Sequence, residues 1–137
     1  MTITVASVND APTTAQSQTV TTLEDTAKTI TVTASDPEGD ALSYAVQTQP
    51  VTGGTVSVVS GNQVLFTPTA GFNGSTSFVV RVSDGTATAD QTVTVNVTGV
   101  NDAPTLTATG SLSTAEDTAY TIGQVTATDS DSGDTLT

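Results

Sequence analysis

Carboxylates recur in short turn-like segments of this chain, and their spacing suits a hard metal ion. The segment 36–40 reads Asp-Pro-Glu-Gly-Asp, and the segment 129–134 reads Asp-Ser-Asp-Ser-Gly-Asp. Carboxylates at alternate positions of a tight turn can converge on one centre, and oxygen donors without His or Cys favour Ca²⁺ over zinc or copper. Without a cation, two carboxylates about 5 Å apart repel by about 3 kcal/mol at an effective dielectric near 20.

Two alternatives compete with a metal site at these segments. The first is a plain Asp/Gly turn at the end of a hairpin, which needs no ion. The second is an EF-hand loop, but the glycine is misplaced and the twelfth position counted from Asp36 is Gln47, not Glu. Whether Asp40 and Asp134 are ligands or turn formers is left open by the sequence.

Further oxygen donors lie outside these two segments and recur in the same way. The linker Asn9–Pro12 returns as Asn101–Pro104, with Asn and Asp side chains, an Ala carbonyl and a stiffening Pro. Glu24 is followed by Asp and returns as Glu116, and Asp84 precedes a glycine after an apolar strand. Taken singly, these motifs are also compatible with an Asx turn, a solvated strand end and an ordinary turn.

The repeated motifs share one offset, which predicts a tandem array. The distances from Asn9 to Asn101 and from Glu24 to Glu116 are equal (101 − 9 and 116 − 24, both 92). We therefore expect residues 1–7 to be the last strand of a preceding repeat, residues 8–99 a complete repeat, and residues 100–137 the truncated N-terminal part of the next.

Alternation of apolar and polar residues predicts an all-β fold. Only 4% of the residues are aromatic, so the core must come mainly from Val, Ile, Leu and Ala. Seven strands with turn signals between them are typical of a β-sandwich. We expect them near residues 18–22, 29–34, 42–46, 55–59, 63–67, 78–82 and 92–97. Within them, Ile30, Val32 and Ala34 share one face, and Val93, Val95 and Val97 point inward.

Charge and residue types exclude several classes of function. A net charge of −12 with two basic residues argues against nucleic acid and anionic membranes. No apolar run is long enough to cross a membrane. Residues 1–5 alternate as in a strand and do not resemble a signal peptide, so we expect any export signal of the parent protein to lie elsewhere. Without His or Cys, no serine has a general base, and the carboxylates lie in turns with no aromatic platform for a sugar. We therefore expect no enzymatic activity.

A set of short motifs spread along the chain carries a resemblance to a known family. They are Phe66–Pro68, Phe72–Gly74, Ser77–Phe78, Val82–Gly85 and Val100–Pro104. In combination they resemble the cadherin-like tandem repeats of large bacterial surface and biofilm adhesins of the RTX type. The resemblance implies a seven-stranded Greek-key β-sandwich, cadherin- or immunoglobulin-like, with Ca²⁺ between successive domains. Thr76 replaces an acid that the family often has, which implies a looser turn there.

The resemblance also implies a calcium site at each junction between repeats. The N-terminal junction would use Asn9, Asp10, Asp36, Glu38 and Asp84. The C-terminal junction would use Glu24, Asn101, Asp102, Asp129 and Asp131, with the Ala103 carbonyl. A mid-domain Asp-x-Glu pair of cadherins has no equivalent, so we expect one or two ions per junction. Each junction lacks a ligand from outside the chain, so dissociation constants on the order of 10⁻⁴–10⁻³ M are expected.

These observations predict a calcium-rigidified extender module of a secreted bacterial surface adhesin, acting in cell adhesion or biofilms. Its partners would be neighbouring repeats of the same chain. One alternative is a spacer or carbohydrate-binding accessory module of a large secreted enzyme, and another is a structural repeat whose acids only solubilise. The segment 100–137 offers two strands and cannot close a core. We expect it to fray, the alternative being strand exchange or another homophilic contact with residues 1–7 of a second copy.

Overall fold

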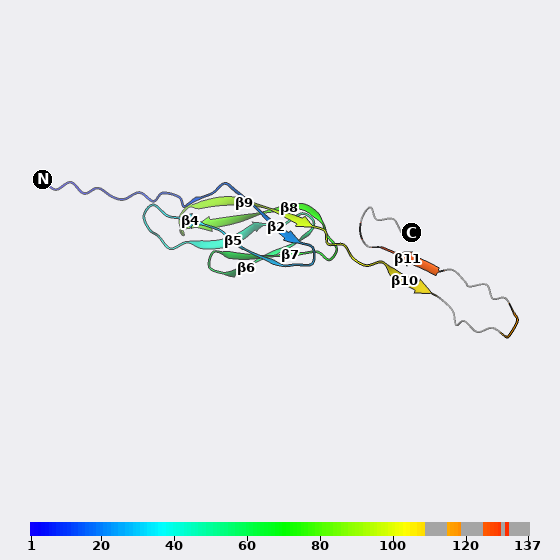
Figure 1. The fold of residues 1–137 in the computed structure, drawn as a ribbon. Coiled ribbons are helices and arrows are strands. Elements are labelled where there is room, and N and C mark those ends of the chain that lie inside the picture. Colours follow the sequence, from blue (N-terminus) through cyan, green and yellow to red (C-terminus); the bar gives the residue numbers. More distant parts are fainter. Residues whose placement is uncertain (109–114, 119–124, 130, 132–137) are drawn as a thin grey trace. The chain divides into compact units, whose positions relative to one another are not determined.

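The computed structural model describes residues 1–108, 115–118, 125–129 and 131 (Figure 1). The chain separates into two compact units, Met1–Gly99 and Val100–Thr137, which are described in turn. The division into parts of three repeats stays a prediction. Asp134, whose role the sequence left open, lies outside the described residues.

One layer of the first unit is a four-stranded sheet. Its strand order is β2 (Ser17–Leu23), β9 (Thr88–Thr98), β8 (Gly74–Ser83) and β5 (Ser43–Thr48). β2 runs parallel to β9, whereas β9 and β8, and β8 and β5, pair antiparallel. The long β8–β9 pair lies at the centre of this sheet, and residues 84–87 form the hairpin that joins the two strands.

The other layer is a three-stranded antiparallel sheet packed against the first (Figure 1). Its order is β3 (Lys28–Thr31), β7 (Gln63–Pro68) and β6 (Gly54–Ser60). Two short strands, β1 (Thr13–Thr14) and β4 (Ala34–Ser35), pair beside these layers. Six of the seven strands expected from the sequence are present, the seventh is divided between β3 and β4, and the described residues form an all-β sandwich without a helix.

Alternate side chains of both sheets build one core of Val, Ile and Phe. The buried residues are Ile30, Val32, Val56, Val64, Phe66, Phe78, Val80, Val82, Val93, Val95 and Val97. The aromatic rings of Phe66 and Phe78 stack across the layers with their centroids 6.5 Å apart. The inward positions expected from the alternation are therefore confirmed for Val93, Val95 and Val97.

Two local expectations are wrong. The strand expected at residues 29–34 breaks, because β3 ends at Thr31 and the Val32 N–H donates to the Asn62 carbonyl, 2.9 Å away, before β4 begins. The looser turn expected at Thr76 is not found. This residue lies inside β8 with 8% of its surface exposed, and its hydroxyl donates to the Thr52 carbonyl at 2.7 Å. The neutral Thr76 hydroxyl therefore ties β8 to the loop that contains Thr52.

The described part of the second unit repeats the way in which the first unit begins. β10 (Thr105–Ala108) pairs antiparallel with β11 (Val125–Thr128). The Thr105 hydroxyl contacts the carbonyl and the hydroxyl of Thr128 at 3.3 and 3.0 Å. In the first unit, the Thr13 hydroxyl makes the same two contacts with Ser35, at 3.0 and 2.9 Å. The sequence repeat is thus matched by a repeated structural element.

Residues 1–7, expected to form the last strand of a preceding repeat, are exposed and pair with no strand of the described residues. Among the described residues, no helix has the length and apolar character needed to cross a membrane.

Candidate metal centre

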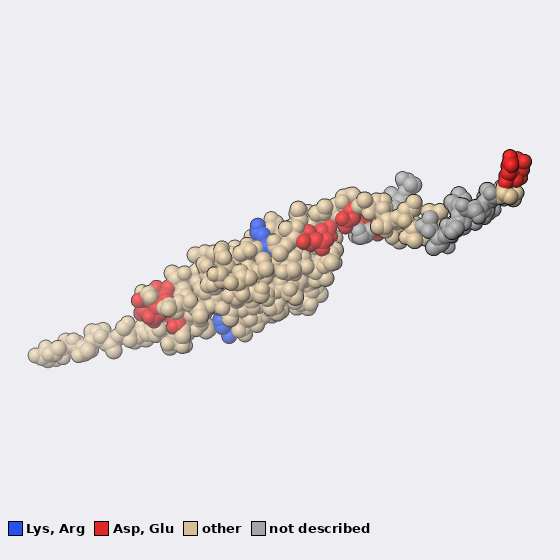
Figure 2. Space-filling model, turned by 90° about the horizontal axis from the view of Figure 1, so that it is seen from below, with Lys and Arg blue, Asp and Glu red and all other residues tan. Residues whose placement is uncertain are grey.

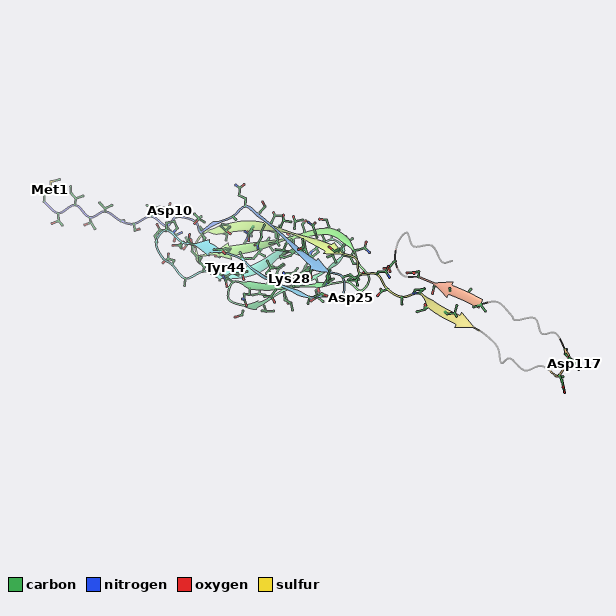
Figure 3. All side chains as sticks on the ribbon, in the orientation of Figure 1. Met1, Asp10, Asp25, Lys28, Tyr44 and Asp117 are labelled. Carbon is green, nitrogen blue, oxygen red and sulfur yellow. The ribbon has the colours of Figure 1, made fainter. Side chains whose placement is uncertain are left out.

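Apart from Asp90, which pairs with Arg81 between β9 and β8, the acidic side chains of the first unit gather at its ends, as Figure 2 shows for the visible face. Figure 3 places Asp10 and Asp25 at opposite ends of the sandwich. At the end that holds Asp10, three segments meet: the linker 9–12, the loop 36–40 after β4, and the hairpin 84–87 between β8 and β9. The antiparallel pairing of β1 with β4 brings the first two together, because the chain enters β1 where it leaves β4.

Two hydrogen bonds attach the linker to both loops. The Asn9 side-chain N–H donates to Asp84 Oδ2 at 3.0 Å and to the Asp10 carbonyl at 3.1 Å. The Asp10 backbone N–H donates to Glu38 Oε2 at 3.0 Å. The structure thus brings together the five residues predicted for the N-terminal junction when Asp36, which anchors the loop of Glu38, is included.

Asp36 has two oxygens in different situations. Its Oδ1 accepts hydrogen bonds from the backbone N–H groups of Glu38 and Asp40, at 2.9 and 3.1 Å, and so closes the loop. Its Oδ2 is buried and has no hydrogen-bond partner. Leaving such an atom unsatisfied costs roughly 1–3 kcal/mol, more for a charged group. A bound cation would remove this cost, so Asp36 is the best-supported ligand candidate.

Asp84 closes the hairpin between β8 and β9. Its Oδ1 accepts from the backbone N–H groups of Thr86 and Ala87, both at 2.6 Å. The hydrogen bond from Ala87, then those from the Asn9 side chain and from Thr86, lower the pKa of the Asp84 carboxyl from its ordinary value. Asp84 therefore carries its negative charge into moderately acidic solution.

The lowered pKa of Asp84 predicts a pH effect on stability. A carboxyl with a lower pKa in the folded than in the unfolded state stabilises the fold above its unfolded pKa, near 3.9, and loses this contribution as the pH falls through its folded pKa. The free energy of unfolding should therefore fall less between pH 7 and acid pH in Asp84→Asn than in the wild type. Urea unfolding in EDTA at a series of pH values measures this difference.

The control for this experiment is Asp40→Asn, which removes an exposed carboxylate from the same end and changes the net charge equally. If the stability curves of wild type and Asp84→Asn run parallel from neutral to acid pH, the hydrogen bonds to Asp84 do not stabilise its charged form.

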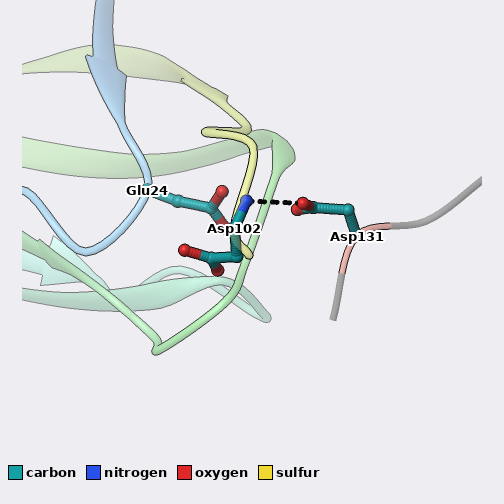
Figure 4. Close-up of side chains that lie close together, drawn as sticks. All are labelled: Glu24, Asp102 and Asp131. Carbon is teal, nitrogen blue, oxygen red and sulfur yellow. Dashed lines mark hydrogen bonds between the residues drawn. The ribbon is translucent and has the colours of Figure 1, made fainter. Parts of the chain in front are cut away.

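The second unit repeats the hydrogen-bond pattern of the first around its own linker. The Asp102 N–H donates to Asp131 Oδ2 at 2.6 Å (Figure 4), and the Asp131 N–H donates to Asp129 Oδ1 at 2.9 Å. The Asn101 side-chain N–H donates to the Asp102 carbonyl at 3.2 Å. These contacts match those of Asp10 with Glu38, Glu38 with Asp36, and Asn9 with Asp10.

Glu24 belongs to the first unit, whereas the other four ligands predicted for the C-terminal junction belong to the second, and the two units are described separately. Glu24 follows β2 and is 7% exposed, and its backbone N–H donates to the Thr98 carbonyl at 2.9 Å. Its neighbour Asp25 accepts a hydrogen bond from the Gly71 N–H at 3.1 Å. A carboxylate that is this buried is rare unless it is paired.

The chemistry of the donors suits Ca²⁺ at the N-terminal end. The available atoms are carboxylate, amide and backbone carbonyl oxygens, which are the ligands of a hard cation. Within the first unit, every residue of which the structure describes, no three carboxylates bring one oxygen each within 4.8 Å of one another. Neutral oxygens of the linker would therefore have to complete the coordination. The guanidinium group of Arg81 is already paired with the Asp90 carboxylate, at 2.7 Å.

The sequence pattern of a known family covers most of the first unit. The bacterial Ig domain family matches residues 9–96, which is more than half of the chain. The chain belongs to the bacterial Ig domain family. The two packed sheets agree with this assignment.

Solved structures similar to this bacterial Ig domain include two endo-fucoidan hydrolases of glycoside hydrolase family 107. MfFcnA4 matches with a TM-score of 0.53 and 23% identity over 66% of this chain and 14% of that enzyme. MfFcnA9 matches with a TM-score of 0.50 and 20% identity over 64% of this chain and 16% of that enzyme. The match thus spans a small part of each enzyme, and at this identity it shows the fold alone. A search of curated proteins found no match.

Proposed function

We propose that this bacterial Ig domain is a non-catalytic, calcium-binding spacer module of a secreted multidomain protein. One observation carries the proposal: Asp36 Oδ2 is a buried carboxylate oxygen without a partner, at the point where the linker and two acidic loops meet. The same contacts recur around the linker of the second unit. An acid cluster that only solubilised would keep its oxygens in water.

The bound ion would act by neutralising charge and by fixing the linker. Asp36 would supply one carboxylate oxygen together with either Glu38 or Asp84, because no three carboxylates of the first unit lie close enough to bind one ion, and the linker would supply neutral oxygens. At present backbone and amide N–H groups partly balance these charges, because Asp10 donates to Glu38 and Asn9 donates to Asp84. A bound cation would neutralise the carboxylate charge that these N–H groups leave, and it would hold the linker against the sandwich more firmly.

Two kinds of parent protein fit such a module. The host supported better is a large secreted enzyme, because the two fucoidan hydrolases contain the fold as 14–16% of their chains. In such a host the domain would be a spacer or accessory module.

The second candidate host is a surface adhesin built from many repeats of this domain. The 92-residue offset between the two linkers, together with the repeated pairing of β1 with β4 and β10 with β11, favours it. In this host, calcium at successive linkers would stiffen a stalk that holds a terminal binding domain away from the cell. Both hosts place the domain outside the cell.

A thermal melt in EDTA, in 10 mM Ca²⁺ and in 10 mM Mg²⁺ tests the proposal. With a dissociation constant on the order of 10⁻⁴–10⁻³ M, calcium stabilises the fold by about 1.4–2.7 kcal/mol. For a domain of this size that raises the melting temperature by roughly 6–20 °C. Magnesium should give a much smaller rise, because it demands octahedral geometry and dehydrates reluctantly. Equal melting temperatures in EDTA and calcium would contradict the proposal.

A further inference from the structure

A hollow of about 230 Å³ lies on the first unit, and no acidic residue lines it. It is bounded by the crossover from β1 to β2, by the end of β3 and by the start of β9. Its lining residues are Ala15, Ser17, Gln18, Thr31, Thr33 and Gln91. Five of these six side chains are polar, none is charged and none is aromatic.

The polar side chains of this hollow lack intramolecular partners. No hydrogen bond is made by the side chains of Ser17, Gln18, Thr31, Thr33 or Gln91 within the described residues. A second hollow of about 310 Å³ shares Ala15 and Thr33 with the first. There the hydroxyls of Thr13 and Thr14 are already bound to backbone carbonyls, at 3.0 Å each. Ser17, Thr31 and Thr33 are exposed and can bind water, so the unsatisfied group of the smaller hollow is the buried Gln91 Oε1.

Gln91 gives the hollow a buried polar floor. It occupies the inward position that precedes Val93, Val95 and Val97 in β9, where an apolar residue would be expected. Only 2% of its surface is exposed, and its Oε1 has no hydrogen-bond partner. A buried unsatisfied group costs about 1–3 kcal/mol and calls for an explanation. The last side-chain torsion of a glutamine is broad, so its amide can turn one edge toward the hollow.

The residue types of the hollow define the ligand that would fit. An anion finds no basic residue there, and a cation finds no carboxylate. An apolar ligand would bury the free hydroxyls and amides unpaired, which costs free energy. We propose that the hollow binds one neutral sugar unit. The hydroxyls of a pyranose both donate and accept hydrogen bonds, as Ser, Thr and Gln side chains require.

The size of the hollow makes this a weak site. The volume lies below the 300–1,000 Å³ of ordinary ligand pockets, and no ring is available for stacking. A dissociation constant on the order of 1–10 mM is expected. Repeats in one chain would raise the effective affinity for a glycan by avidity. None of the lining residues belongs to the acid clusters, so the inference does not depend on bound calcium.

The test is an NMR titration of the ¹⁵N-labelled full chain in EDTA. The probes are methyl β-D-glucopyranoside, methyl β-D-galactopyranoside and methyl α-L-fucopyranoside, with glucose 6-sulfate as an anionic control. We expect at least one neutral glycoside to give saturable shifts in the Gln91 side-chain amide and in the backbone amides of residues 15–18 and 31–33. The sulfated sugar should bind at least tenfold more weakly.

Substitutions of lining residues test whether the sugar binds in this hollow. Thr33→Val and Gln91→Leu should each weaken binding at least tenfold, and Thr33→Val, at an exposed site, leaves the core untouched. Thr21→Val, an exposed position of β2 outside the hollow, should bind like the wild type. The proposal is overturned if no probe gives saturable shifts, if Thr33→Val binds as tightly as Thr21→Val, or if Gln91 shows contact with bound water only.

Discussion

Asp36→Asn is expected to remove most of the rise in melting temperature that Ca²⁺ produces, while changing stability in EDTA little. Asn keeps an oxygen that can accept the N–H groups of Glu38 and Asp40, so the loop still closes. It replaces the unpartnered Oδ2 with a neutral amide nitrogen, which cannot bind a cation. We therefore expect calcium affinity to fall at least tenfold, about 1.4 kcal/mol, as measured by calorimetric titration and by paired melts.

Asp40→Asn is the matched control for this substitution. It lies in the same loop and removes the same charge, but its carboxylate is exposed and only its backbone N–H contacts Asp36. We expect it to retain most of the calcium response. If both variants lose the calcium-dependent rise in melting temperature equally, that rise depends on the total charge of this end and not on a binding site that includes Asp36.

Phe66→Ala is expected to cause the largest loss of stability of any substitution considered for this domain. The Phe66 side chain is fully buried, and its ring stacks on the ring of Phe78. Gly54 leaves room for the Phe66 ring, because a Cβ atom at position 54 would lie 2.6 Å from it. Truncating a buried Phe costs about 3–5 kcal/mol. Domains of this kind are stable by about 5–15 kcal/mol in total, so this is a large share. Urea unfolding in EDTA measures the change.

The comparison variant is Phe72→Ala, because Phe72 is only half-buried and packs at the margin of the core. Its loss should be clearly smaller, since less apolar surface is removed from the interior. A cost below about 1.5 kcal/mol for Phe66→Ala would mean that the two sheets do not pack around this ring as described.

The sandwich itself could be predicted from the sequence because strand alternation has a period of two. Val93, Val95 and Val97 all fall on one face of β9, and all are buried. The break after Thr31 could not be predicted in this way. The backbone N–H of Val32 leaves the ladder to bind the carbonyl of Asn62, and hydropathy carries no information about such a contact.

The sequence predicted which residues meet at the N-terminal end, but not the contacts between them. The sequence predicted that oxygens of Asn9 and Asp10 bind the metal ion. In the structure, N–H groups of these residues hold the linker by donating hydrogen bonds to Asp84 and Glu38. Residue type shows that oxygen is available, whereas the direction of a hydrogen bond depends on backbone geometry. Gln91 was missed, although its parity with Val93 places it on the inward face.

A Ca²⁺ titration of the full chain followed by NMR tests directly whether the N-terminal end of this domain binds calcium. We expect saturable shifts at the backbone amides of Asp10, Glu38 and Asp40 and at the side-chain amide of Asn9, since these groups donate to the carboxylates that would bind the ion. The amides of the core strands should stay unchanged. Saturable binding that leaves these four groups unshifted, or the absence of any saturable shift, would contradict a calcium site at the N-terminal end of this domain.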